Sequence, residues 1–183
     1  MMIFYQIASG ILLLTSALVL LQGKDWGALG TSLSAVAILL FTEFYLKKRE
    51  KDNEADKRLY QEFLVSLGTH KFETFRSYDF GSAFRSEWFD PLKQHLYSWK
   101  NPEHEFLDKK IAAKHVELLD CIDTLLEEVS VHSNFVGGDV RAISKDLEHA
   151  QFMEAAEAIN TAANNFETKH AEFVRLCKKR LSV

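Results

Sequence analysis

Two apolar segments close together near the start of the chain restrict its fold more than any other feature. Residues 3–22 and 28–46 carry almost no charge, and a short polar connection separates them. Each segment is about the length needed to cross roughly 30 Å of hydrocarbon as an α-helix. Their close spacing favours two retained helices over a cleaved signal peptide. The sequence therefore predicts a transmembrane hairpin over residues 1–46.

Charged residues at the end of segment 28–46 predict its orientation. Lys47, Lys48 and Arg49 follow it directly, and basic residues collect on the cytoplasmic side of a membrane span. Two spans then place both termini in the cytoplasm. Glu43, the only charged residue inside either span, has two interpretations. It could pair with Lys47 one turn later at the membrane interface, or it could line a pore.

The remainder of the chain has the composition of a soluble helical domain. No proline or glycine follows the second span until Gly68, and an apolar side chain recurs every fourth residue before it. We therefore expect a helical stalk over 47–69 that continues the second span. Apolar stripes over 107–129 and 152–177 predict two amphipathic helices in a domain of residues 70–183. The predicted fold is all-α: a transmembrane hairpin followed by a cytosolic helical bundle.

Local signals predict where the helices of this domain begin and end. Residues 79–82 favour a turn that precedes a helix ending near Trp99, and we expect Pro91 to kink or divide that helix. Asn101, which is followed by proline, predicts the start of the next helix. The Gly-Gly pair at 137–138 predicts a loop, and the pattern becomes helical again from Asp139. No β-strand is therefore expected.

Aromatic and basic residues are interleaved over residues 70–106. Aromatic rings can stack on nucleobases, and basic side chains can neutralise phosphates. The same spacing also fits aromatic side chains that fill a small core, and this simpler interpretation stays open. If the domain binds a cyclic oligonucleotide, these residues are where we expect it to bind. The candidate ligand-binding residues are the cations Lys71, Arg76, Arg85 and Lys93 and the aromatics Tyr78, Trp88 and Trp99.

Motifs that carry catalysis or bind metals are missing from the sequence. The histidines are scattered, and no His-Glu-x-x-His, Cys-x-x-Cys, P-loop or dinucleotide fingerprint occurs. Cys121 and Cys177 are too far apart for a metal-binding pair, and we expect buried thiols there. The net charge of −4 argues against a dedicated binder of duplex nucleic acid. We therefore expect neither an enzyme nor a protein that needs a cofactor.

Three basic residues, Lys178, Lys179 and Arg180, close the last predicted helix. Cations at this position are stabilised by the negative end of the helix dipole. Contact with anionic lipid is a second interpretation of the same residues. The dipole explains them with fewer assumptions.

The layout of the chain resembles small bacterial membrane effectors of antiphage defence, including the CRISPR-associated membrane proteins that bind cyclic oligoadenylate. The shared features are a short two-helix anchor, a basic stalk and a cytosolic helical domain. The resemblance implies a homo-oligomer in the bacterial inner membrane that binds a cyclic nucleotide and then forms a pore or disrupts the bilayer. The alternative is a membrane-anchored scaffold or adaptor whose helical domain binds a protein partner.

Overall fold

The computed structural model describes residues 26–68, 72 and 75–183, with side chains from Leu40 onward except that of Arg76. The chain divides into two compact units, Met1–Asp52 and Asn53–Val183. The first predicted span, residues 3–22, lies outside the described residues.

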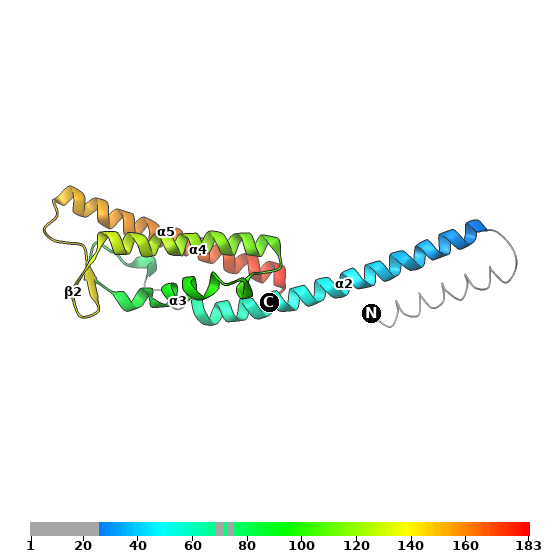
Figure 1. The fold of residues 1–183 in the computed structure, drawn as a ribbon. Coiled ribbons are helices and arrows are strands. Elements are labelled where there is room, and N and C mark those ends of the chain that lie inside the picture. The colour runs from blue at the N-terminus through cyan, green and yellow to red at the C-terminus, as the bar shows by residue number, and fades with distance from the viewer. Residues whose placement is uncertain (1–25, 69–71, 73–74) are drawn as a thin grey trace. The chain divides into compact units, whose positions relative to one another are not determined.

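The long helix α2, Trp26–Leu67, runs without a break through the second predicted span and the predicted stalk (Figure 1). The expected continuity of helix beyond Leu46 is therefore confirmed. The Nζ atom of Lys47 lies 2.8 Å from Oε1 of Glu43, so the predicted ion pair one turn apart is present. Among the described residues, no helix combines the length and the apolar character needed to cross a bilayer.

The second unit is a helical bundle around an aromatic core. It contains α3 (Asp90–Trp99), α4 (Lys109–His132) and α5 (His149–Leu181), and α4 and α5 lie side by side (Figure 1). The last turns of α2 complete the bundle, because Phe63 and Leu67 are fully buried in its core. The predicted predominance of helix is confirmed.

The helices α4 and α5 follow the apolar stripes of the sequence. On α4 the buried side chains run from Ile111 to Val129 at steps of three and four, and on α5 the predicted stripe is buried from Ala156 to Cys177. Leu107, the first residue of the predicted α4 stripe, precedes the helix and is exposed. Burying each large apolar side chain contributes about 1.5–3 kcal/mol, so these stripes dominate the stability of the bundle.

A small antiparallel sheet corrects the all-α prediction. It consists of β1 (Phe84–Arg85), β2 (Asn134–Gly137) and β3 (Val140–Ala142), in the order β1-β3-β2. Gly138 turns the β2–β3 hairpin with a positive φ of 52°, a conformation that glycine adopts without steric cost. The strands are two to four residues long, too short to show the alternation by which strands are recognised.

The helix predicted between the turn at 79–82 and Trp99 is only partly present. The turn is confirmed, because the Ser82 N–H donates to the Asp79 carbonyl at 3.0 Å. Residues 84–89 then form β1 and the short 3₁₀ helix η3 (Ser86–Phe89) instead of α-helix. The α-helix begins only at Asp90, immediately before a proline. Proline suits the first turn because its missing N–H would have no helical partner there.

Two further predicted helix starts are displaced along the chain. Asn101 caps only the short 3₁₀ helix η4, Pro102–His104, and Asp108 caps α4 through the N–H groups of its first turn. Asp139 is followed by β3 instead of helix, and α5 begins ten residues later, after a capping box at Glu148. Cap-forming residues are frequent in this stretch, so the sequence offered several starts and the tertiary fold selected among them.

Candidate functional sites

The predicted aromatic candidates do not form one stacking surface. Trp99 is buried, and its ring stacks on that of His95 with the centroids 4.7 Å apart. Tyr78 and Trp88 do lie together, edge to face at 4.9 Å, and the Tyr78 hydroxyl donates to the carbonyl of Ala83. The core interpretation therefore accounts for Trp99 and for part of the Tyr78–Trp88 pair.

The described basic candidates are paired with neighbouring acids. Arg85 Nη1 lies 2.7 Å from Glu87 Oε1, and Lys93 Nζ lies 3.0 Å from Asp90 Oδ1. Such exposed pairs contribute little free energy and are readily exchanged for a ligand. Lys71 lies outside the described residues, and the side chain of Arg76 is not described.

Lys93 also lines a small cavity, which we call the basic pocket. Its cavity volume is about 240 Å³. Two hydroxyl groups and two cations share its wall with apolar side chains, so its chemistry suits an anionic group. The lining residues are Ser86, Phe89, Lys93, Leu126, Val129, Ser130 and Arg141.

Arg141 is the second cation of the basic pocket, and unlike Lys93 it is not among the residues predicted from the sequence. Its guanidinium donates to the carbonyls of Val129 and Ser133, at 3.2 and 2.6 Å, and to the Ser133 hydroxyl at 2.9 Å. It also lies over the ring of Phe135, 4.7 Å from the centroid. These contacts fix the arginine against the end of α4. No sequence pattern predicts that Arg141 contacts the end of α4, because the β2–β3 hairpin that brings it there was itself not predicted.

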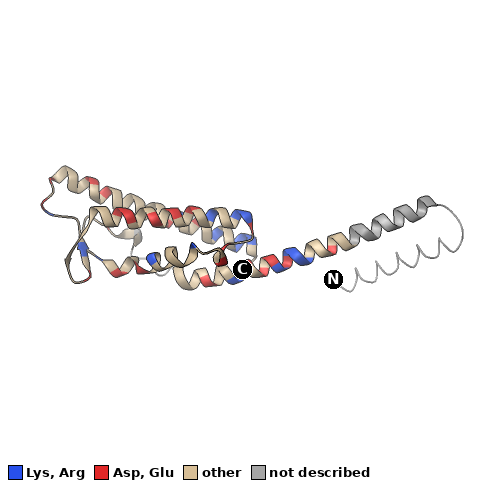
Figure 2. Cartoon of the chain, in the orientation of Figure 1, with Lys and Arg blue, Asp and Glu red and all other residues tan. Residues whose placement is uncertain are grey.

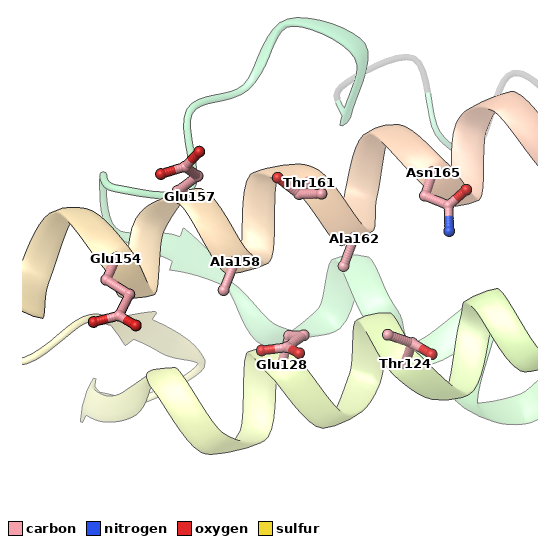
Figure 3. A pocket seen from close by; sticks show the side chains of 8 residues that line it. All are labelled: Thr124, Glu128, Glu154, Glu157, Ala158, Thr161, Ala162 and Asn165. Atoms are coloured by element: carbon pink, nitrogen blue, oxygen red, sulfur yellow. The ribbon is translucent and has the colours of Figure 1, made fainter.

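A second cavity is an acidic groove between α4 and α5, with a volume of about 440 Å³ (Figure 3). Glu128 points from α4 toward the small side chains Ala158 and Ala162 of α5, and Glu154 and Glu157 lie along the same helix. The alanines open the space, and the carboxylates make it suited to cationic groups. Glu128 already pairs with His132 at 3.1 Å. The complete lining is Thr124, Glu128, Glu154, Glu157, Ala158, Thr161, Ala162 and Asn165.

Three buried histidines, His95, His115 and His170, meet around Phe63 of α2 and form what we call the histidine cluster. They come from α3, α4 and α5 respectively. The Nε2 atoms of His95 and His115 lie 3.3 Å apart, at hydrogen-bonding distance. The cluster therefore links every α-helix of the second unit at one point of the core.

The histidine cluster holds the last turn of α2. Nε2 of His170 lies 2.7 Å from the Leu67 carbonyl, and Nδ1 of His95 lies 2.9 Å from the Ser66 hydroxyl. That hydroxyl donates its hydrogen to the Phe63 carbonyl at 3.0 Å. We therefore assign the Nδ1 hydrogen to His95, whose Nε2 then accepts from His115. A chain of hydrogen bonds runs from α4 through α3 to the end of α2.

Burial keeps these imidazoles neutral. Desolvation, reinforced by neighbouring histidines, lowers the pKa of His95 to about 2. Desolvation likewise lowers the pKa of His115 to about 4, and it lowers that of His170 despite the bond to Leu67. Neutral imidazoles can act as donor and acceptor at once, which is what the hydrogen-bond chain requires.

Two buried polar atoms beside the histidine cluster, Tyr60 Oη and His104 Nδ1, have no hydrogen-bond partner among the described residues. Each such atom costs about 1–3 kcal/mol relative to a satisfied one. The His104 ring lies 4.7 Å from that of Trp99, and the Tyr60 ring lies 6.3 Å from that of Phe63. This part of the core is therefore less favourable than an apolar core of the same volume.

Side chains that could bind a metal ion are not gathered into a site in the described part of the chain. No set of three or more His, Cys, Asp or Glu side chains there is placed to hold a metal ion. Cys177 is buried as expected, whereas Cys121 is only partly buried. Burial together with the charges of Asp56 and Asp108 raises the pKa of the Cys177 thiol to about 12. A thiol with such a pKa is a poor nucleophile.

Comparisons with protein-family models, with curated proteins and with solved structures find no match to the chain.

Proposed function

We propose that this chain is a membrane effector, in which the N-terminal hairpin anchors in the inner membrane and the helical unit senses a ligand in the cytosol. The observation that carries the proposal is the continuity of α2. One helix contains the apolar segment 28–46 and the buried core residues Phe63 and Leu67. Helices are rigid elements that can carry coupling between sites, so a change at the end of α2 has a physical route to the hairpin.

The histidine cluster supports this route. His95 and His170 hold the last turn of α2 from α3 and α5. A ligand that shifts either helix must lengthen or realign those hydrogen bonds. The cluster is thus the point at which we expect ligand binding to bias the position of α2.

We propose that the ligand binds at the basic pocket. Two cations line its wall: Arg141, and Lys93, which is among the ligand-binding residues predicted from the sequence. Its volume of about 240 Å³ is below the roughly 300–1,000 Å³ of pockets for drug-sized ligands. It has room for one phosphate or one base of a larger molecule. A cyclic oligonucleotide would then be shared between subunits of a homo-oligomer.

The proposed action on the membrane, a pore or disruption of the bilayer, also requires an oligomer. Two helices cannot enclose a pore, so either conduction or disruption of the bilayer needs several hairpins. Glu43 would face such an assembly near the cytoplasmic interface, with its charge balanced by Lys47.

The test uses the full chain reconstituted in dye-loaded vesicles, with calorimetry of cyclic oligonucleotide binding on the same preparation. We expect binding to be followed by dye release. Lys93→Ala should weaken binding about tenfold, the loss typical of a charge-assisted hydrogen bond. Lys145→Ala, which removes an exposed lysine outside the pocket, is the matched control. Absence of binding by every cyclic oligonucleotide would overturn the ligand assignment, and binding without dye release would overturn the output.

A second function, a membrane-anchored adaptor, is favoured by the exposed strand β2. This strand lies at an edge of the sheet, and its Phe135 and Val136 are 61% and 62% exposed. Edge strands can pair with an extended segment of a partner protein. Replacing residues 1–46 with an unrelated two-span anchor separates the two functions. An adaptor keeps its activity after this exchange, whereas an effector loses it.

A further inference from the structure

The end of the second unit at which α2 enters it brings three helices together. The buried Asp56 of α2 accepts hydrogen bonds from the N–H groups of Leu107 and Asp108, at 2.7 and 2.8 Å. Asp108, the cap of α4, pairs with Arg180 near the end of α5, with Oδ2 and Nη2 2.5 Å apart. The start of α4 and the end of α5 are therefore held against the entry of α2.

Four exposed lysines surround this junction, and we call them the basic end: Lys109, Lys110, Lys178 and Lys179. Figure 2 shows basic residues gathered where α4 begins and α5 ends. No hydrogen bond or ion pair joins these ammonium groups to another residue that the structure describes. The carboxylates of Asp56 and Asp108 at the junction are already engaged, by backbone N–H groups and by Arg180.

The helix dipole explains only half of the basic end. Lys178 and Lys179 lie in the last turn of α5, where the negative end of the dipole favours cations. Lys109 and Lys110 lie in the first turn of α4, which contains no acidic residue. Cations at that end are disfavoured by the dipole. Their presence beside a second lysine pair indicates an external anion.

We propose that the basic end docks on anionic lipid headgroups of the membrane that holds the hairpin. This inference rests on the proposed membrane anchor. Six residues lie between Leu46, where the apolar segment ends, and Asn53, where the second unit begins. The second unit is therefore tethered to the membrane by a short piece of chain, and anionic headgroups at a membrane surface attract basic residues. Lys114 is not part of the basic end, because its charge is neutralised by an ion pair with Glu117.

Amine labelling of the full chain tests the docking surface. The chain is reconstituted in vesicles of phosphatidylcholine alone and of phosphatidylcholine with phosphatidylglycerol, and the labelling rate of each lysine is followed by mass spectrometry. In the anionic vesicles we expect the four lysines to react about five-fold more slowly, the factor that corresponds to about 1 kcal/mol per basic residue. Lys93 and Lys145, exposed outside the basic end, are internal references that should not change. High salt should remove the protection.

A double variant and its matched control complete the test. Lys109→Gln with Lys179→Gln should reduce the protection of Lys110 and Lys178, whereas Lys145→Gln should leave it unchanged. A chain that floats with both vesicles but is labelled equally in both overturns the docking proposal alone. A chain that floats with neither overturns the anchor and the docking together. Protection that grows with protein density in both lipids shows that a second copy covers the basic end, and also overturns the proposal.

Discussion

Asp56 is the residue whose side chain ties the entry of α2 to the start of α4. It is 2% exposed, and its two carboxylate oxygens each accept one backbone N–H, from Leu107 and Asp108. Those two N–H groups have no other acceptor among the residues that the structure describes. A single buried carboxylate therefore satisfies two part-buried backbone donors at the start of α4.

Asp56→Ala should lower the free energy of unfolding by about 2–4 kcal/mol, because it leaves two backbone donors unpaired. Chemical denaturation of the detergent-solubilised chain measures the loss. Asp123→Ala is the control, since the Asp123 side chain makes an exposed ion pair with Lys100 at 3.4 Å and no other hydrogen bond or ion pair with a described residue. The control should change stability by less than about 0.5 kcal/mol. Equal effects of the two substitutions would contradict the role of Asp56.

The histidine cluster makes stability depend on pH in a definite direction. In the unfolded chain a histidine gains its proton near pH 6.5, whereas burial lowers the pKa of His95 to about 2 and that of His115 to about 4. Below pH 6.5 the unfolded state therefore binds more protons than the folded state. Stability should fall on acidification from pH 6.5 toward pH 4, by up to about 1.4 kcal/mol per pH unit for each histidine.

His115→Phe should reduce that slope by the contribution of one histidine. Its measurement is the denaturation midpoint at a series of pH values between neutrality and pH 5. The comparison variant is His149→Gln, which removes an exposed histidine and should keep the full slope. If both variants titrate like the natural chain, the cluster is not the source of the acid sensitivity.

At the scale of elements, Arg141 of β3 closes the C-terminal end of α4. It donates to two carbonyls of that end and to the Ser133 hydroxyl. Helix ends leave their last carbonyls without intrahelical partners, so one arginine does what a glycine cap does elsewhere. It also attaches the hairpin to the bundle.

Arg141→Ala should lower stability by about 1.5–3 kcal/mol, the value for hydrogen bonds to a charged group. It should also increase amide hydrogen exchange in the last turn of α4. Lys145→Ala, in the loop after the hairpin, serves as the control and should alter neither quantity. Unchanged exchange at residues 129–133 in the Arg141 variant would show that the cap is dispensable.

The sequence predicts those elements whose hydrophobic periodicity extends over several turns of helix. The stripes of α4 and α5 repeat over several turns, so their helices were found, although their starts were displaced. The β2–β3 hairpin was missed because its strands are too short to alternate. The aromatic and basic composition of residues 70–106 indicates Lys93 as a ligand-binding residue. Arg141 lines the same pocket only because the hairpin places it there. The histidine cluster is not predicted from the sequence, because its members are far apart along the chain and come together only when the helices pack.

At the scale of the whole molecule, the continuity of α2 is the feature that the proposed coupling uses. If a signal passes along this helix, a break in it should separate sensing from output. Asp52→Pro should provide the break, because proline within a helix removes a hydrogen bond and costs about 3 kcal/mol or more. We expect ligand binding to persist while dye release from vesicles is lost.

Asp52→Ala is the matched variant, because it removes the same carboxylate but keeps the helix. It should bind ligand and release dye as the natural chain does. Dye release by the proline variant at the natural rate would mean that α2 only tethers the two units. That outcome would favour the adaptor.

The most direct test of the account is whether the full chain is an integral membrane protein. The measurement is the share of the chain that stays with isolated inner membranes after alkaline washing and then floats with them in a density gradient. If the hairpin spans the bilayer, nearly all of the chain should stay and float with the membranes. Leu14→Arg with Leu39→Arg, which places a charge in each apolar segment, should release much of it. Recovery of the natural chain in the alkaline supernatant would contradict the membrane anchor and, with it, the proposed effector.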